Sequence, residues 1–501
     1  MTVSVDSVDV LVWGGGTGGA AAAIQAARGG ASSLLLTPGS WLGGMVSSAG
    51  VCCPDGNELT PWQTGLWGAF LRELERHEPD GLDHNWVSCF GYRPSTAETI
   101  LQSWVDQESR LLWWPCTRLL EVESAGALIT AVRVEVDGEI RKVSCRVVID
   151  GSDRGDLLPL ANAPFRFGWE AREQWNEPSA PTLERLREED FFRAQPVQSP
   201  TWVVMGQLQS ERLREFSSPG DGALSPQLSD PFRGACDAFG LEKTITYGRL
   251  PSGLVMLNWP LHGNDWHQKI ERAFLGDPDQ EAALFSEMQT HSLRFAGELI
   301  KASGGWLQLG EAFPADASSP APWLASMPYW REGRRMIGRT TVIEQDLLPQ
   351  TQQSLIDDQP LNDSAVPQSI AVGNYANDHH YPGDDWPLAP KSCRWGGRWT
   401  GTPFCIPYGA LLSDTIDNLL SADKAFSTSH MANGATRLQP LIMNVGQAAG
   451  AASALAVEFM QQPCELSVRI LQDRLITDAS APSAVAPLWD TPWHHSAWRQ
   501  R

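Results

Sequence analysis

The sequence predicts an α/β protein: a Rossmann-like domain with a parallel sheet, built from two separate parts of the chain, and an inserted α+β domain. Two observations carry this prediction. An apolar run at 10–13 leads directly into a glycine-rich turn and an alanine-rich helix, and a second apolar run follows at 32–36. Near residue 416 a short strand and an alanine-rich helix return. Strands that alternate with helices are typical of parallel sheets.

The first element is a strand, a tight turn and a helix within residues 10–27. In a dinucleotide-binding turn Gly14 permits the turn, Gly16 lets a pyrophosphate approach the backbone, and Gly19 lets helix and strand pack closely. The helix directs its free N–H groups at the phosphates. An ordinary glycine-rich βα turn is the alternative. The candidate cofactor-binding residues here are Gly14, Gly16, Thr17, Gly18 and Gly19.

The next elements extend this first domain. We expect a strand at 32–36, a helix over 94–110, and strands over 116–149 around the Asp137-Gly138 turn. The last of these strands ends in another tight turn at Asp150-Gly151-Ser152.

From about residue 178 the chain becomes charged and is interrupted by prolines, which indicates a departure from the sheet. We therefore predict the first part of the dinucleotide-binding domain at 1–177 and a substrate domain at 178–395. The second part of the first domain follows at 396–465, with a strand at 418–420 and a helix at 446–460, and a C-terminal tail occupies 466–501.

Composition limits the partners and the location of the chain. The formal charge of −21, from 59 acidic and 38 basic residues, opposes binding to nucleic acid or to an anionic membrane surface. Nine cysteines without a CxxC pair indicate neither a disulfide framework nor a zinc site, so we expect a cytoplasmic protein. The uncharged stretch 438–457 is rich in Gly and Ala and predicts a buried helix, not a membrane span. The sequence is compatible with an oligomer.

The segment after the second strand distinguishes between a nicotinamide and a flavin. It contains Trp41, Leu42, Gly43, Gly44 and Met45 in succession. This segment resembles the Leu-Gly-Gly-Met segment of FAD-dependent oxidoreductases that have a flavin domain of the glutathione-reductase type. The resemblance implies FAD as the cofactor, with Trp41, Gly43, Gly44 and Met45 close to it.

Further segments resemble one family of these flavoproteins, the FAD-dependent oxidoreductases sometimes labelled xanthan lyase-like, and they occur in the order of that family. The segments are 150–156, 329–335, 375–380, 406–408, 418–420, 429–430 and 437–450. The region 178–325 is weakly matched. The resemblance implies that Gly151, Ser152 and Asp153 also contact the cofactor.

One position departs from the family pattern. A carboxylate about 20 residues beyond the glycines usually holds the ribose hydroxyls, and the family has Glu there. This chain has Thr37, and no Asp or Glu occurs between Asp9 and Asp55. Either the hydroxyls of Thr37 and Ser40, or water, hold the ribose, or the cofactor is held weakly or lost.

The resemblance places a helix start at Gly446 and Gln447. A helix N-terminus stabilises the negative charge that gathers on a reduced flavin, so both residues are candidates for cofactor binding. The same residues are compatible with a helix that merely packs closely through its small side chains.

Three arginines stand at helical spacing in a second segment. Arg331, Arg334 and Arg335 are at positions i, i+3 and i+4, so on a helix they share one face. With Glu332 they form either a structural ion-pair network or an anchor for a substrate carboxylate. We include Arg331 and Arg335 among the candidate catalytic residues.

Two histidines are candidates for proton transfer. Asp378 and His380 are two residues apart, which places them on one side of an extended strand, and a carboxylate beside an imidazole fits a general base. His430 is the second candidate through the resemblance. No set of residues has trustworthy metal-ligand spacing, so we expect no metal.

These observations favour an FAD-dependent dehydrogenase or oxidase that transfers a hydride from a small organic substrate, with an anionic or aromatic group, to the flavin. The electron acceptor, oxygen or another, stays open. A flavin monooxygenase or halogenase and a non-enzymatic binding protein are the alternatives.

Overall fold

The computed structural model describes residues 6–58, 60–82, 85–209, 228–260, 263–314, 321–347, 368–382, 386–388 and 403–485. Its central element is a seven-stranded sheet with the order β3-β2-β1-β6-β5-β4, in which β15 pairs with β6. The strands are β1 (Ser7–Trp13), β2 (Ser33–Leu36), β3 (Leu111–Trp114), β4 (Arg118–Ala125), β5 (Leu128–Val136), β6 (Glu139–Asp150) and β15 (Leu419–Ser421).

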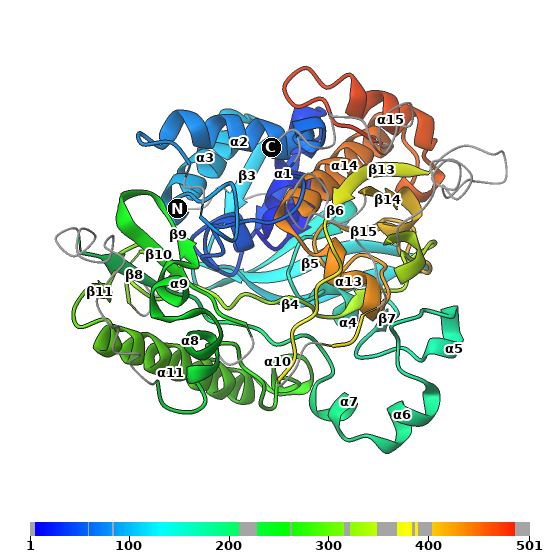
Figure 1. Cartoon of the computed structure of the whole chain (residues 1–501). Coiled ribbons are helices and arrows are strands. Elements are labelled where there is room, and N and C mark those ends of the chain that lie inside the picture. Colours follow the sequence, from blue (N-terminus) through cyan, green and yellow to red (C-terminus); the bar gives the residue numbers. More distant parts are fainter. Residues whose placement is uncertain are drawn as a thin grey trace.

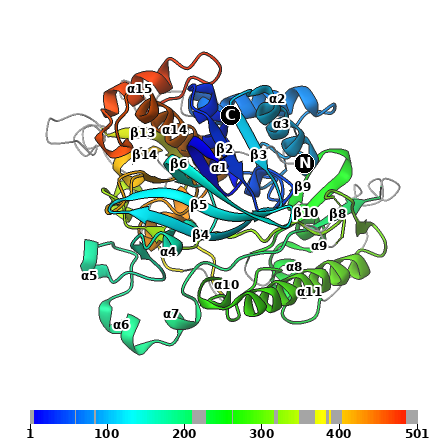
Figure 2. The ribbon, with the colours of Figure 1, turned by 180° about the vertical axis from the view of Figure 1, so that it is seen from behind.

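The two parts of the Rossmann-like domain meet in this sheet. Strand β1 pairs in parallel with β2 and with β6. Strand β15 joins from the far end of the chain and pairs in parallel with the C-terminal end of β6, Leu419 opposite Val148. The prediction of a parallel sheet assembled from two parts of the chain is therefore confirmed. Strands β4 and β5 extend the sheet as an antiparallel meander, visible in front in Figure 2.

Four longer helices accompany the parallel strands, and two of them pack on each other unusually closely. They are α1 (Thr17–Arg28), α2 (Gly65–His77), α3 (Pro94–Gln107) and α14 (Gln439–Glu458). Helices α1 and α14 lie side by side (Figure 1). A Cβ on Gly446 of α14 would lie 2.1 Å from the carbonyl oxygen of Gly18 in α1, so only glycine permits this approach. Helix α14 is long and apolar enough to cross a membrane, but 94% of its most apolar window is buried in the fold.

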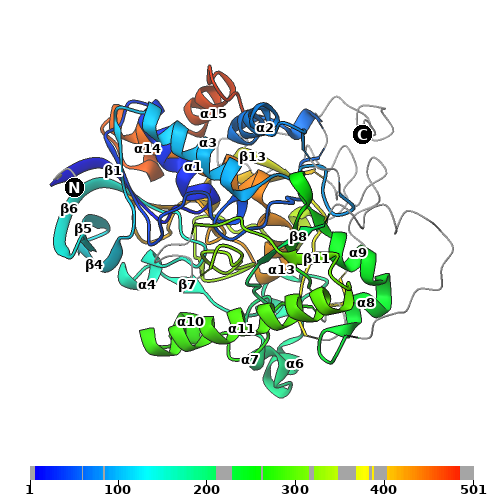
Figure 3. The same cartoon turned by 90° about the vertical axis from the view of Figure 1, so that its left-hand side faces the viewer.

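The inserted region forms a second layer on the other side of the molecule (Figure 3). Its antiparallel sheet has the order β11-β8-β10-β9. The strands are β8 (Val204–Leu208), β9 (Gly248–Arg249), β10 (Leu254–Leu257) and β11 (Leu307–Leu309). The accompanying helices are α8 (Arg233–Phe239), α9 (Leu241–Thr246), α10 (Arg272–Leu275) and the long α11 (Pro278–Ala302). This arrangement of segregated strands and helices is the α+β architecture expected from the sequence.

Short elements connect the two layers. Strand β7 (Phe165–Arg166) pairs with β12 (Arg335–Met336), and β13 (Ser369–Asn374) pairs with β14 (Pro403–Pro407). Strands β13 and β14 lie on opposite sides of the domain boundary predicted at 395. The remaining helices are α4 (Leu157–Leu160), α5 (Arg172–Trp175), α6 (Leu183–Glu188), α7 (Phe191–Ala194), α13 (His430–Thr436) and α15 (Val468–Ile476). Helix α15 lies within the predicted tail and packs on α14. The tail residues 486–501 lie outside the described part of the chain.

Candidate functional site

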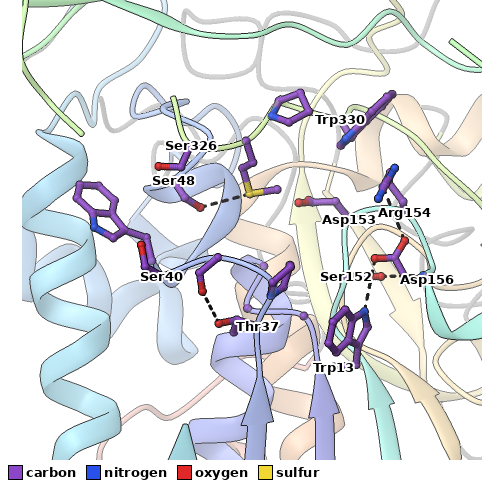
Figure 4. A pocket seen from close by; sticks show the side chains of 18 of the residues that line it. Trp13, Thr37, Ser40, Ser48, Ser152, Asp153, Arg154, Asp156, Ser326 and Trp330 are labelled. Carbon is purple, nitrogen blue, oxygen red and sulfur yellow. Dashed lines mark hydrogen bonds and ion pairs between the residues drawn. The ribbon is translucent and has the colours of Figure 1, made fainter. Parts of the chain in front are cut away.

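A cavity of about 380 Å³ opens at the carboxyl ends of β1, β2 and the β6 strand (Figure 4). This is where ligands bind in open α/β sheets. Its walls include these predicted cofactor residues: Gly14, Gly16, Thr37, Trp41, Ser152 and Asp153. The segment 326–328, Trp330 and two residues of α11 line it from the inserted region.

The glycine turn is shaped by contacts that leave no room for side chains. Gly14 has a φ of +94°, and a Cβ there would lie 2.5 Å from the backbone nitrogen of Ser152. The second glycine segment is tied to this turn, because the Gly43 N–H donates to the Gly15 carbonyl at 2.7 Å and the Thr17 hydroxyl donates to the Gly43 carbonyl at 2.7 Å. The two glycine segments that the sequence singled out therefore form one cradle.

The other residues predicted around this cradle take supporting positions. Gly151 packs against Gly19, where a Cβ on Gly151 would lie 2.3 Å from the Gly19 Cα. A Cβ on Gly44 would lie 2.9 Å from the Gly16 Cα. Met45 is buried in the hydrophobic core and does not line the cavity.

Thr37 lines the cavity, but its hydroxyl already has partners. It donates to the Gly39 carbonyl at 2.8 Å and accepts the indole N–H of Trp113 at 3.0 Å. The side chain is 1% exposed. Thr37 therefore stands where the family has a carboxylate. Its hydroxyl is a weaker hydrogen-bond acceptor for the ribose hydroxyls than that carboxylate.

An internal carboxylate lies at the start of α1. Asp423 lies two residues after the end of β15, and its Oδ2 accepts the backbone N–H of Gly18 at 2.8 Å. A Cβ on Gly16 would lie 2.6 Å from the same oxygen. Burial raises the pKa of Asp423 to about 7, although the N–H groups of Gly18 and Lys424 lower it. The residue stands at the first turn of α1, where helix N–H groups bind phosphate.

Further charges surround Asp423. Lys424 contacts Asp153 and lies 3.3 Å from Oδ1 of Asp423. Burial also raises the pKa of Asp150 to about 7, with Asp156 adding to the shift. The start of α1 therefore carries more acidic than basic neighbours, which disfavours a second anion while Asp423 is ionised.

A second, polar cavity of about 80 Å³ lies beside the first. Residues 328 and 330 line the large cavity, whereas Tyr329 and Arg331 line the small one. Side chains of an extended segment alternate between its two sides, so the segment 328–331 forms a wall between the cavities. The small cavity is also lined by Asp55, Asp378, His380, Arg437 and Gln439.

Asp378 and His380 interact on the wall of the polar cavity, as their spacing suggested. His380 Nε2 lies 2.8 Å from Asp378 Oδ2. Arg437 donates to the same oxygen at 3.2 Å, and the Tyr375 hydroxyl does so at 3.3 Å. Burial alone would raise the pKa of Asp378, but His380 and Arg437 hold it below its ordinary value. His380 Nδ1 has no hydrogen-bond partner.

The expectation that the three arginines share a helical face is wrong. The segment is extended, and Arg335 belongs to β12. Arg331 donates to the Ser199 carbonyl and to Thr201, whereas Arg334 donates to the carbonyls of Arg154 and Phe274. Gly333 explains the extended path, because a Cβ there would lie 2.8 Å from the Arg154 Cα and the chain must stay flat against that loop.

Arg335 is placed in the core, away from both cavities. It forms ion pairs with Glu170 at 3.0 Å and with Glu332 at 3.2 Å. It therefore takes the structural ion-pair role that the sequence left open, and only Arg331 reaches the polar cavity.

His430 is also placed in the core. Its Nδ1 lies 2.8 Å from Glu332 Oε1, its Nε2 contacts the Tyr381 hydroxyl, and its ring lies 3.9 Å from the Trp169 ring. The side chain is 1% exposed, and burial lowers its pKa. Because it lines neither cavity, its position favours a structural role over the predicted proton transfer.

The helix start expected at Gly446 lies seven residues earlier. Helix α14 begins at Gln439, after an extended Leu438 and with Pro440 in its first turn. Gly446 packs against Gly18 inside the fold, and the Gln447 side chain bonds the Leu66 N–H and the Ala481 carbonyl. Both residues therefore contribute to the packing of α14. The N-terminus of α14 lies at the polar cavity, which Leu438 and Gln439 line.

Three residues have roles that the sequence reasoning missed: Asp423 at the start of α1, and Tyr329 and Arg437 on the wall of the polar cavity. Asp423 lies two residues beyond the parallel strand β15, and ligand-binding side chains gather at the carboxyl ends of such strands. Arg437 lies just before the proline that starts α14. Among the described residues, no group of three or more His, Cys, Asp or Glu side chains could hold a metal ion.

The family model described as FAD dependent oxidoreductase matches residues 9–475. The chain belongs to this family. FAD is therefore its cofactor, and the glycine cradle of the large cavity fits the pyrophosphate of that cofactor. The fit is incomplete at two points. Thr37 replaces the carboxylate that usually binds the ribose, and Asp423 already accepts the Gly18 N–H at the start of α1, where a phosphate would bind. The search of curated proteins found no match.

Solved structures similar to this member of the family have low sequence identity to it. The flavin-dependent brominase Bmp2 is 11% identical, with 93% of this chain and 83% of that chain covered and a TM-score of 0.40. A geranylgeranyl bacteriochlorophyll reductase-like protein from Thermoplasma acidophilum is 10% identical, with coverage of 94% and 84% and a TM-score of 0.35.

A match to L-proline dehydrogenase from P. horikoshii is partial. It is 16% identical, covers 30% of this chain and 23% of that chain, and has a TM-score of 0.18.

Proposed function

We propose that this oxidoreductase oxidises a small polar substrate held in the polar cavity, with His380 as the proton acceptor. The observation that carries the proposal is the contact of 2.8 Å between His380 Nε2 and Asp378 Oδ2 on the wall of that cavity. The segment 328–331 borders both cavities, and the N-terminus of α14 reaches the polar one through Leu438 and Gln439. Hydride transfer requires direct contact of the reacting atoms, so the proposal requires the flavin ring of bound FAD to reach past this segment to the polar cavity. When bound, FAD supplies the acceptor for a hydride.

The protonation of His380 follows from its partners. Because Asp378 stays ionised, it accepts the Nε2–H of His380, and the lone pair of the imidazole is then on Nδ1. Nδ1 has no hydrogen-bond partner. An imidazole that donates one N–H to a carboxylate can act as a general base through its other ring nitrogen. The Ser199 N–H fixes the backbone of this residue by donating to the His380 carbonyl at 3.0 Å.

The proposed step balances as follows. The substrate loses a hydride from carbon and a proton from the oxygen or nitrogen attached to that carbon, so the bond between the two atoms becomes double. His380 Nδ1 takes the proton, and the two electrons leave with the hydride. Asp378 stabilises the imidazolium, and Arg437 fixes the orientation of this carboxylate by donating to the same oxygen at 3.2 Å.

The experiment compares two histidine variants under anaerobic conditions. Loss of the visible flavin band on mixing with substrate measures the hydride step directly. We expect His380→Asn to bind FAD normally and to slow this step by about 10²–10⁴-fold. His430→Asn, a change at a histidine that lines neither cavity, keeps the rate of the folded fraction within a small factor. A near-normal rate in His380→Asn would contradict the proposal.

A further inference from the structure

We infer that the substrate carries a carboxylate, and that Arg331 binds this group through two adjacent N–H donors. The inference rests on the proposed function in one respect, the assignment of the polar cavity as the substrate site. It names the class of substrate as a short acid whose oxidisable carbon bears a hydroxyl or an amino group.

Arg331 is a buried cation without a carboxylate partner. It is 2% exposed, and its guanidinium contacts only neutral acceptors, namely the Ser199 carbonyl, the Thr201 hydroxyl at 2.9 Å and the Asn258 amide oxygen at 3.4 Å. Among the described residues no carboxylate lies within ion-pair distance of it. Asp265 and Asp378 favour its charge from a distance, but burial still lowers the pKa of Arg331. An anionic ligand in direct contact would therefore stabilise this buried charge further.

The donors that remain free lie on one edge of the guanidinium. Nη1 donates to both Ser199 and Thr201, whereas Nε has no partner and Nη2 has only the long contact to Asn258. Nε and Nη2 are adjacent nitrogens, and their N–H groups form the fork that binds a carboxylate through two parallel hydrogen bonds. The Tyr329 ring, 4.7 Å from the guanidinium carbon, holds the plane of this fork.

The other charges of the cavity leave Arg331 as the place for an anion. Asp378 is shared between His380 and Arg437, so these three groups neutralise one another in part. Asp55 also lines the cavity, and it opposes the entry of a ligand with a second negative charge. Three further wall residues each keep an unpaired polar atom: His380 Nδ1, Arg437 Nε and Gln439 Oε1.

The size of the cavity limits the length of the acid. A volume of about 80 Å³ holds roughly five water-sized groups. Arg331 and His380 both line this small space, so a molecule that bridges them is short. A carboxylate, the adjacent carbon and its hydroxyl or amino group together satisfy this limit.

The test uses the FAD-loaded enzyme and two matched sets of probes. Glycolate, lactate, glycine and alanine are titrated, and the corresponding amides, in which an uncharged amide replaces the carboxylate, serve as isosteric controls. Perturbation of the flavin absorbance spectrum and the shift in melting temperature report binding without any need for turnover. We expect the acids of at least one class, hydroxy or amino, to bind about 10- to 100-fold more tightly than their amides.

The variants Arg331→Gln and Arg331→Lys assign the effect to the guanidinium fork. Arg331→Gln is expected to remove the preference for acids, and Arg331→Lys to restore it only partly, while FAD affinity stays unchanged. Arg339→Gln is the control, since Arg339 pairs with Asp417 at the surface, outside both cavities. The comparison of acids with amides in the unmodified enzyme needs no variant to fold.

The outcomes separate the two proposals. Equal binding of acids and amides, no binding of any acid, or unchanged preference in Arg331→Gln overturns the carboxylate inference. If an acid binds preferentially but never bleaches the flavin, the carboxylate site stands and the proposed hydride reaction fails. If a neutral substrate bleaches the flavin through His380, the reaction stands and the inference fails.

Discussion

The clearest consequence of the structure concerns Asp423 and the loading of FAD. The pyrophosphate of the cofactor and the Asp423 carboxylate require the same first turn of α1, where Asp423 already accepts the Gly18 N–H at 2.8 Å. Two anions at one helix start repel each other, so FAD binds best when Asp423 is protonated. We therefore expect FAD binding to take up a proton.

The magnitude follows from the pKa of Asp423, which burial raises to about 7. Below this pKa the carboxyl is already neutral, and above it each pH unit costs about 1.4 kcal/mol, or a factor of ten in affinity. Since the carboxyl is half ionised at pH 7, we expect the Kd for FAD to rise about fivefold between pH 7 and pH 8. Asp423→Asn should bind FAD about tenfold more tightly than the unmodified protein at pH 8 and about equally at pH 6.

Quenching of flavin fluorescence at low salt measures these affinities. Asp414→Asn, an exposed aspartate in the same part of the chain, is the control and should leave the affinity unchanged. The other charged groups near this site are Asp150, Asp153 and Lys424. Any weak pH dependence of the FAD affinity that persists in Asp423→Asn is expected to come from Asp150. If Asp423→Asn binds FAD more weakly at pH 8, the carboxylate is a ligand of the cofactor and the reasoning is refuted.

Three further predictions follow from packing and burial. Gly446→Ala should lower the free energy of unfolding, measured with urea, by about 1–3 kcal/mol, because the new methyl would lie 2.1 Å from a backbone oxygen of α1. Gly297→Ala is the control: it lies at an exposed and open helix position and should raise the free energy of unfolding by about 0.5–1 kcal/mol. Gly14→Ala should abolish FAD binding, as equilibrium dialysis would detect, because φ is +94° and the Cβ would meet backbone. The FAD-free protein should lose stability as the pH rises from 4 to 7. In the folded protein Asp150 and Asp423 hold their protons up to about pH 7, whereas in the unfolded chain they release them near pH 4. A urea midpoint that does not change over this range would contradict the raised pKa values.

The sequence could predict the Rossmann-like half because local signals specify it. The strand, the glycine turn and the alanine-rich helix are contiguous, so no tertiary information is needed to see them. The strand near 419 was also visible, but its place beside β6 is a long-range pairing that only the fold shows. The domain boundaries stay predictions.

The site was harder to predict because its geometry depends on tertiary contacts. The spacing of Arg331, Arg334 and Arg335 fits a helix, yet the segment lies flat against the Arg154 loop at Gly333 and directs the arginines to different partners. The start of α14 was misplaced because the glycines near 446 resembled a helix start, whereas Pro440 is the local signal that marks it.

The measurement that tests the central claim most directly is the anaerobic absorbance spectrum of the FAD-loaded protein mixed with short hydroxy and amino acids. The account predicts that at least one acid bleaches the flavin band, that its amide does not, and that His380→Asn slows the bleaching by about 10²-fold or more. Bleaching by NADPH alone, with no response to any acid, would contradict it and would favour a monooxygenase or halogenase.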